Sequence, residues 1–213
     1  MTPSALHRLH SLRVRNEQAA ADMDEARPMF DRMRNRHENG TAPRAVTAYQ
    51  LFQTPEAIAA QMVELLPEAG DAPRILEPSA GLGRLINAAL NRWPSAEITA
   101  IEEAAQLAGE LFHHQAEGLT LLQRDFLAVD PDSLGQFDFV LINPPFHMRA
   151  DIRHIRHALQ FVRPGGTLAA LCMNTRHRVE AFQDIADHWQ PLPAGTFKES
   201  GTNIETILFT ITK

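Results

Sequence analysis

The stretch from Phe137 to Phe146, Phe-Asp-Phe-Val-Leu-Ile-Asn-Pro-Pro-Phe, constrains the fold more than any other part of the sequence. Its first six residues are mostly apolar, which predicts a buried strand over 137–142. Pro144 and Pro145 lack a backbone N–H and cannot continue a strand, so the strand must end there. An amide side chain, a carbonyl group and an aromatic ring therefore follow the carboxyl end of a central strand. In open α/β sheets, ligands bind at that edge.

Strand and helix patterns alternate on both sides of this stretch. Further parallel strands are expected over 74–77, 97–102, 119–126 and 167–173. Helices are expected from Pro55, with Thr54 as the N-cap, and over 84–92, 104–117, 147–162 and 179–190. Two final strands, joined by 197–203 and ending with 205–211, would pair antiparallel. The predicted fold class is α/β, a Rossmann-like, seven-stranded, mostly parallel sheet with an antiparallel C-terminal edge hairpin.

Three of the predicted strands end in residues suited to a nucleotide-like ligand. The turn Glu77-Pro-Ser-Ala-Gly-Leu-Gly83 joins a strand to a helix and aims backbone N–H groups at that edge. Many turns of this kind need their glycines for steric reasons alone, so the motif is weak by itself. Glu102 follows about twenty residues later, where a carboxylate can accept both ribose hydroxyls. Asp125 and Phe126 end the next strand and suit an adenine amino group and ring.

Composition excludes several classes of protein. The single cysteine, Cys172, rules out an internal disulfide framework and a Cys-rich zinc site. The ten histidines show no H-E-x-x-H spacing, so we expect no metal site. No apolar run has the length of a membrane span, and the first residues carry no signal-peptide-type apolar segment. We therefore expect a soluble, cytoplasmic protein without membrane contact.

The N-terminal part differs from the rest. Residues 1–40 are predicted to form a helical extension, and residues 41–213 the main domain. The extension has an imperfect apolar stripe among charged residues, so we expect it to pack on the main domain, on a second copy or on a protein partner. A solvated docking helix is the favoured interpretation over a nucleic-acid-binding arm.

Basic charge gathers just after the Asn-Pro-Pro-Phe tetrapeptide. Arg149, Arg153 and Arg156 recur at helical spacing there and form a concentrated basic patch. Their partner could be a nucleic-acid phosphate, although a solvated helix face explains them equally well. The net charge of −6 argues against strong non-specific binding of nucleic acid.

Together these motifs resemble those of the class I S-adenosylmethionine-dependent methyltransferases. The similarity covers residues 50–213 and rests on five motifs in order, Phe52-Gln-Thr-Pro55, Glu77-x-x-x-Gly81-x-Gly83, Glu102, Asp125-Phe126 and Asn143-Pro-Pro-Phe146. More narrowly, the order is similar to that of the gamma-type adenine-N6 DNA methyltransferases of small phage or plasmid type. The resemblance implies that S-adenosyl-L-methionine is the cofactor and that an exocyclic amino group is the methyl acceptor.

The resemblance also implies a role for each matching residue. The cofactor-binding residues would be Thr54, Pro55, Glu77, Ala80, Gly81, Gly83, Glu102, Asp125 and Phe126. The catalytic residues would be Asn143, Pro144 and Phe146. The Asn143 side-chain oxygen and the Pro144 carbonyl would each accept one hydrogen of the amino group, which aims the nitrogen lone pair at the methyl donor. Phe146 would stack on a base that is single-stranded or flipped out of a duplex, and the three arginines would bind the substrate.

Three functions stay open on the sequence alone. Adenine N6 in DNA is the favoured acceptor, although the sequence shows no separate domain that would recognise a DNA sequence. An RNA base, adenine N6 or guanine N2, is the alternative, because ribosomal-RNA guanine methyltransferases also have a histidine where His147 stands. A non-catalytic cofactor-binding or partner subunit is the third. Protein glutamine methyltransferases usually have tyrosine in place of Phe146 and are disfavoured.

Overall fold

A computed structural model describes residues 53–213, apart from 106, 109–116 and 201. These residues belong to the second of two units of the chain, Gln50–Lys213, and only that unit is described. The predicted helical extension over 1–40 lies outside the described residues, as do 41–52 and most of the predicted helix over 104–117.

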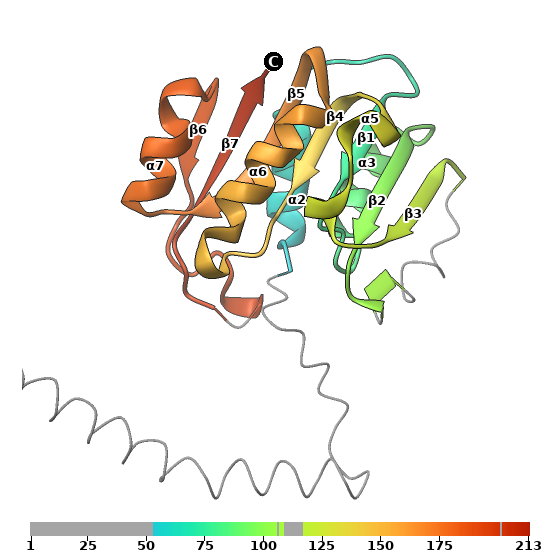
Figure 1. Cartoon of the computed structure of the whole chain (residues 1–213). Helices are drawn as coiled ribbons and strands as arrows, with labels where there is room; N and C mark the ends of the chain where they lie inside the picture. The colour runs from blue at the N-terminus through green and yellow to red at the C-terminus, as the bar shows by residue number, and fades with distance from the viewer. Residues whose placement is uncertain (1–52, 106, 109–116, 201) are drawn as a thin grey trace, which may run out of the picture. The chain divides into compact units, whose positions relative to one another are not determined.

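Seven strands form one sheet in the order β3-β2-β1-β4-β5-β7-β6 (Figure 1). Their bounds are β1 Arg74–Glu77, β2 Glu97–Glu102, β3 Leu119–Gln123, β4 Phe137–Ile142, β5 Val162–Met173, β6 His188–Pro191 and β7 Thr206–Thr212. β7 runs antiparallel to β5 and β6, and all other neighbours are parallel. The predicted Rossmann-like, mostly parallel α/β sheet with an antiparallel pair at its C-terminal edge is confirmed.

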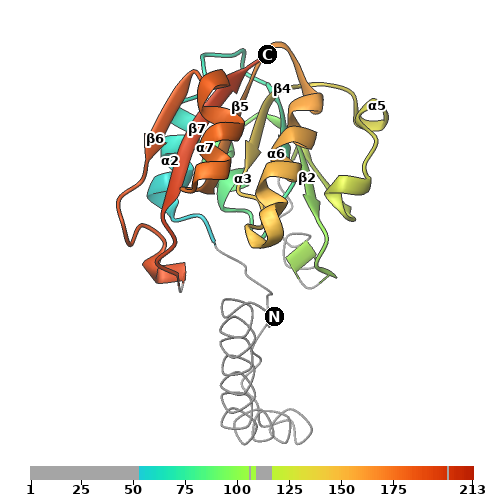
Figure 2. The same cartoon turned by 60° about the vertical axis from the view of Figure 1, so that its left-hand side comes forward.

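Helices cover both faces of this sheet. The α-helices are α2 Glu56–Glu64, α3 Arg84–Arg92, α5 Pro131–Leu134, α6 Ala150–Phe161 and α7 Arg176–Phe182. Short 3₁₀ helices are η1 Phe126–Ala128, η2 His147–Arg149, η3 Gln183–Ile185 and η4 Lys198–Ser200. α2 and α3 lie on one face, and α6 and α7 on the other (Figures 1 and 2). Among the described residues, no helix is both long and apolar enough to cross a membrane.

The central strand β4 explains why both faces need a helical layer. Phe139 and Leu141 belong to the core beneath α2 and α3, whereas Val140 and Ile142 belong to the core beneath α6. All four side chains are at most 3% exposed. Successive residues of a strand point to opposite faces, so an unbroken apolar run is what a strand buried on both sides requires.

The C-terminal part departs from the expected helix over 179–190, which is wrong beyond Phe182. The chain turns through η3, and residues 188–191 become the edge strand β6. Trp189 packs its ring on Phe209 of β7, with centroids 5.2 Å apart, and pairs with it in the ladder. A tertiary contact with a strand later in the chain therefore decides the structure of this segment, and local periodicity does not contain that contact.

Two strand boundaries also differ from expectation. β3 ends at Gln123, since the residues after Asp125 turn into η1 instead of continuing the ladder to 126. β5 begins at Val162 instead of Thr167, and its pairing with β4 shifts register between Phe137 and Phe139. The predicted turn over 163–166 is therefore an irregularity inside a longer strand.

Candidate active site

The carboxyl ends of β3, β2, β1 and β4 lie side by side, toward the bottom of the sheet in Figure 1. Their exits carry, in that order, Asp125, Glu102, the Glu77–Gly83 turn and Asn143. The order of strands along the chain reverses between β1 and β4. Doubly wound sheets bind ligands at such a switch point. Folding thus gathers at one edge the groups predicted from four separate parts of the sequence.

The turn after β1 has a backbone conformation that glycine adopts most readily. Gly81 has φ 53° and Gly83 has φ 78°, both in the left-handed region. The Ala80 N–H donates to the Ile101 carbonyl over 3.0 Å, and the Gly81 N–H donates to Glu102 Oε2 over 2.8 Å. Both bonds fix the turn on the neighbouring strand β2.

Both carboxylate oxygens of Glu102 accept hydrogen bonds from backbone N–H groups. Oε2 accepts from Gly81 and Oε1 accepts from Ala104, each over 2.8 Å. An ionised carboxylate oxygen can accept more than one hydrogen bond. The Glu102 carboxylate is thus fixed in position, and its oxygens can still accept hydrogen bonds from the hydroxyl groups of a ligand.

Glu77 ends β1 as a buried acid, only 2% exposed. Its Oε2 has no hydrogen-bond partner among the residues that the structure describes. Burial raises the pKa of Glu77 well above its ordinary value, the nearby Glu102 charge raises it further, and the Ile86 N–H lowers it in part. A buried acceptor of this kind suits a ligand with a positively charged amino group, because that charge would favour the carboxylate.

Asp125 and Phe126, adjacent in sequence, lie in different environments. Asp125 is exposed, and its Oδ1 accepts from the Leu127 N–H over 2.9 Å at the start of η1. The Phe126 ring is 3% exposed and packs on His157 and Phe161 of α6, with centroids 4.7 and 5.4 Å away. The carboxylate is therefore accessible to a ligand, whereas the ring belongs to the core, and its contact with adenine stays a prediction.

Asn143 follows β4, and its Nδ2 donates to Thr54 Oγ1 over 3.0 Å. The prediction that Thr54 caps the helix and Pro55 begins it is wrong. α2 begins at Glu56 with Pro55 in the N-cap position and no side-chain cap. The Thr54 hydroxyl lies one residue too early to cap α2, is 4% exposed, and bonds Asn143 instead. Because the amide nitrogen faces Thr54, the amide oxygen points away from it.

The segment that carries Thr54 is held on two further sides. The Gln53 carbonyl accepts from Ser200 Oγ over 2.7 Å, and Arg84 Nη2 reaches Gln53 Oε1 over 3.5 Å. Arg84 also pairs with Glu56 over 3.1 Å. Residues from η4 and from the start of α3 therefore fix the segment that orients the Asn143 amide.

The rest of the tetrapeptide is largely covered. Pro144 is buried, and the Phe146 side chain is 4% exposed. The Phe146 carbonyl accepts from Arg178 Nη2 over 3.4 Å. For a base to stack on the Phe146 ring, the groups that cover the ring would have to move, so this role stays a prediction.

Asp151 and Arg178 form a buried ion pair that no sequence motif marks. Arg178 Nε donates to Asp151 Oδ2 over 2.9 Å, and Nη2 donates to Oδ1 over 2.8 Å. The side chains are 0% and 8% exposed. The one sequence signal is an acid in the first turn of α6, beside the residues that pack on the sheet, and a favourable charge at a helix N-terminus explains that equally well.

The basic patch lies on the surface after the tetrapeptide, with one difference from expectation. Arg153 and Arg156 are exposed on α6, but Arg149 precedes the helix, with φ 59°. Its Nη2 donates to His177 Nε2 over 3.0 Å. Met148 also has a left-handed backbone, φ 46°, and its side chain is 89% exposed. Regular helical spacing therefore holds for two of the three arginines.

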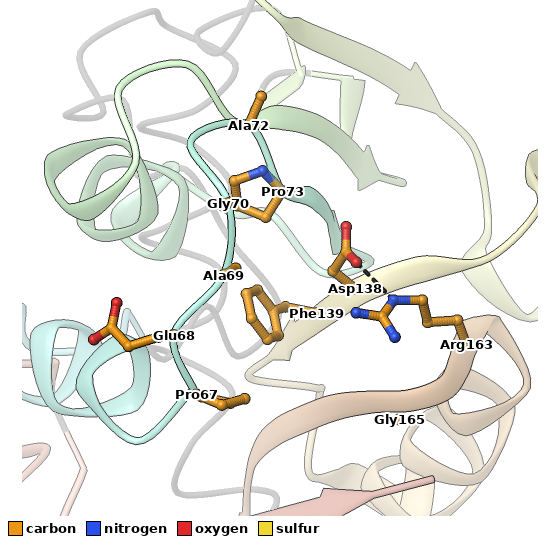
Figure 3. Close-up of a pocket in the computed structure, with 10 residues that line it drawn as sticks. All are labelled: Pro67, Glu68, Ala69, Gly70, Ala72, Pro73, Asp138, Phe139, Arg163 and Gly165. Carbon is orange, nitrogen blue, oxygen red and sulfur yellow. Dashed lines mark hydrogen bonds and ion pairs between the residues drawn. The ribbon is translucent and has the colours of Figure 1, made fainter.

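A hollow of about 440 Å³ lies at the opposite end of the strands, near the amino ends of β1 and β4 (Figure 3). Asp138 and Arg163 face each other there in an ion pair of 2.6 Å. None of the residues that line it belongs to the predicted site. It is separate from the edge where Glu77, Glu102 and Asn143 meet.

Known proteins share both the sequence pattern and the fold. The chain is 31% identical over 125 residues to a malonyl-[acyl-carrier protein] O-methyltransferase of Paenibacillus, over 54% of this chain and 44% of that one. It is 27% identical over 134 residues to the rRNA N(6)-adenosine-methyltransferase metl-5 of Caenorhabditis elegans, over 56% and 62%. It is 29% identical over 144 residues to the type II methyltransferase M.XamI of Xanthomonas campestris pv. amaranthicola, over 65% and 26%. The chain thus spans less than two thirds of each of these relatives.

Several solved structures share the fold of this chain. TrmN from Thermus thermophilus superposes with a TM-score of 0.59 at 19% identity, over 78% of this chain and 51% of that one. Geranyl diphosphate methyltransferase in complex with S-adenosylmethionine gives a TM-score of 0.57 at 12% identity, over 74% and 84%. Residues 57–190, more than half of the chain, match the family described as methyltransferase small domain. The chain therefore belongs to the methyltransferase small domain family, a family of S-adenosylmethionine-dependent methyltransferases.

Proposed function

We propose that the protein methylates the exocyclic N6 amino group of adenine in nucleic acid, with DNA as the favoured polymer. The observation that carries this proposal is the orientation of the Asn143 amide. Its nitrogen donates to Thr54 Oγ1 over 3.0 Å, which fixes the orientation of the amide, and its oxygen is the end that can accept a hydrogen bond. It lies at the switch point of the sheet, next to the edge assigned to the cofactor.

The described residues fit S-adenosylmethionine at that edge. Glu77 has a buried carboxyl oxygen without a hydrogen-bond partner in the described part of the chain, which suits the ammonium group of the methionine moiety. In this proposal, Glu102 would accept hydrogen bonds from the ribose hydroxyls, and Asp125 from the adenine amino group. When bound, the cofactor supplies an activated methyl group, and the protein supplies position and polarity.

The proposed mechanism answers a chemical difficulty. An exocyclic amino group is a poor nucleophile because its lone pair is delocalised into the ring. The Asn143 oxygen and the Pro144 carbonyl would accept hydrogen bonds from its two N–H groups, hold the nitrogen close to tetrahedral geometry and aim the lone pair at the methyl carbon. The nitrogen–methyl bond would form as the methyl–sulfur bond breaks, the electron pair of that bond would stay on sulfur, and the methylated nitrogen would release one proton to water. Orientation of this kind supplies a large part of the rate enhancement in transfer reactions.

Two relatives bear on the choice of polymer. The Caenorhabditis relative is named as an rRNA N6-adenosine methyltransferase, and the Xanthomonas relative as a type II methyltransferase. RNA adenine is therefore the second candidate substrate. An oxygen acceptor, as in the name of the Paenibacillus relative, is disfavoured by the Asn-Pro-Pro-Phe tetrapeptide, whose two acceptor groups match the two hydrogens of an amino group.

The test is mass spectrometry of nucleosides from DNA and RNA incubated with cofactor carrying a deuterated methyl group. We expect labelled N6-methyladenine from the wild-type protein. We expect Asn143→Ala to lower kcat by about 10²-fold, with cofactor affinity kept, since Asn143 contacts the acceptor. Label in RNA alone would select the second candidate. Cofactor binding without any labelled nucleoside, or equal activity of the variant, would contradict the proposal.

A further inference from the structure

We propose that Arg178 and Asp151 are positioning residues that hold the Asn-Pro-Pro-Phe tetrapeptide in its catalytic arrangement. This inference rests on the proposed function, because it concerns the same acceptor site. The contact that carries it is the bond from Arg178 Nη2 to the Phe146 carbonyl, 3.4 Å long, made by a guanidinium that Asp151 holds at two points.

The tetrapeptide needs an anchor of this type because of its prolines. Pro144 and Pro145 have no N–H, so half of the backbone donors of the segment are missing. Such a segment is held through its carbonyl groups, and these need a donor. The Pro144 carbonyl is assigned to the substrate in the proposed mechanism, and in the structure the Phe146 carbonyl has such a donor in Arg178. Arginine offers five N–H donors and no acceptor.

The pair ties several parts of the site together. Asp151 also accepts from the Ile152 N–H over 3.1 Å and from the Met173 N–H over 3.4 Å. Arg178 Nη1 donates to Thr175 Oγ1 over 3.2 Å. The ends of β5 and β4 and the beginnings of α6 and α7 are therefore connected through two side chains. A shift of any of these elements would move the Phe146 carbonyl.

Burial sets this pair apart from the other ion pairs. In every other ion pair of the described chain, at least one side chain is 47% or more exposed. A buried pair adds little net stability compared with apolar residues of similar size, because both charges lose their hydration. What such a pair provides is a fixed, bidentate geometry. The contact of Arg178 with the Phe146 carbonyl brings that fixed geometry to the tetrapeptide.

Two variants separate positioning from stability. Arg178→Lys keeps the charge but loses the two-point contact with Asp151. The double variant Asp151→Leu with Arg178→Met replaces the pair by apolar groups, which is often neutral for stability. We expect both to bind S-adenosylmethionine within about twofold of wild type and to lose about 10²-fold in kcat, the cost of a misplacement of about 1 Å. Arg163→Lys, in the exposed pair with Asp138 at the opposite end of the sheet, is the matched control and should keep its activity.

Hydrogen exchange supplies a readout that does not depend on the substrate. If the double variant unfolds at the same temperature as the wild type, the backbone amides of residues 146–149 should still exchange faster in the double variant. Faster exchange with lower kcat supports the inference. A stable double variant with wild-type kcat, or with unchanged exchange over 146–149, overturns it. If the wild-type protein binds cofactor but methylates neither DNA nor RNA, the proposed function fails, and the exchange measurement alone decides the role of the pair.

Discussion

Thr54 and Asn143 lie 89 positions apart in the chain and are joined by one hydrogen bond of 3.0 Å between their side chains. Thr54 is 4% exposed, and Asn143 is half-buried. The segment before α2 and the end of β4 therefore form one structural unit. The orientation of the Asn143 side-chain oxygen, which would accept a hydrogen bond from the substrate, therefore depends on Thr54, a residue that the sequence associates with the cofactor.

Replacing Thr54 tests this dependence. Thr54→Val keeps the shape and removes the hydroxyl, so the Asn143 amide loses its orienting partner. A hydrogen bond of this kind contributes about 0.5–1.5 kcal/mol, which corresponds to a fall in kcat of about 2- to 10-fold. Steady-state methyl transfer measures the change, and Thr54→Ser, which keeps the hydroxyl, should stay close to wild type. Equal rates for Val and Ser would show that the bond does not orient the amide.

The buried acid Glu77 should make the ligand-free protein sensitive to pH. Its pKa is raised in the folded protein by burial and by Glu102, while the unfolded chain titrates near about 4.3. Between these two pKa values the folded state keeps a proton that the unfolded chain has lost. The stabilising contribution is therefore complete below the unfolded pKa and is lost as the pH rises through the folded pKa.

The measurement is the unfolding temperature of wild type and Glu77→Gln across this pH range. Glutamine imitates the neutral acid and does not titrate. We expect the two proteins to match at low pH and the wild type to fall below the variant as the pH rises. Saturating S-adenosylmethionine should reduce the difference, since its ammonium group would pair with the carboxylate. Parallel curves without cofactor would contradict this account of Glu77.

The exposed arginines on α6 lead to a prediction about how DNA binding depends on salt concentration. If Arg153 and Arg156 each contact a phosphate of duplex DNA, the double variant with glutamine at both positions should have a shallower dependence of log K on log salt. The expected change in slope is about 0.9 per contact, or about 1.8 in all. Fluorescence anisotropy over a salt series measures it. Arg163→Gln, at the opposite end of the sheet, is the control, and an unchanged slope in the double variant would identify a solvated helix face.

The glycine turn offers a comparison within one protein. Gly83 has φ 78°, so Gly83→Ala places a side chain in a left-handed conformation at a cost of about 1–2 kcal/mol. Gly70 has no atom within 4 Å of an added methyl group. Gly70→Ala should therefore change the free energy of unfolding by less than about 0.5 kcal/mol. Urea titration of both variants measures the difference, and equal losses would show that the turn is not strained by a side chain.

Local pattern was sufficient for much of the sheet. The expected bounds of β1, β2, β4 and α3 agree with the structure. Short, mostly apolar runs between turn residues are typical of buried strands in a parallel sheet. The same runs place Glu77, Glu102, Asp125 and Asn143 at one edge, since carboxyl ends of parallel strands meet there.

Local sequence patterns did not predict the contacts between residues that are distant in the sequence. β6 is a strand because it pairs with β7, and Thr54 turns away from its helix because Asn143 lies beside it. The pair of Asp151 and Arg178 joins two polar positions that each suit a surface when taken alone. Their common cause is the approach of segments that lie far apart along the chain, which a single sequence does not encode as a local signal.

The position of β7 has a consequence for synthesis of the chain. β7 lies between β5 and β6 although it is the last of the seven strands along the chain. As the ribosome extends the polypeptide, the backbone groups on one side of β5 stay without a ladder partner until residues 206–212 arrive. An unpaired strand edge is a template for aggregation. In the nascent protein that edge of β5 therefore stays open until β7 forms.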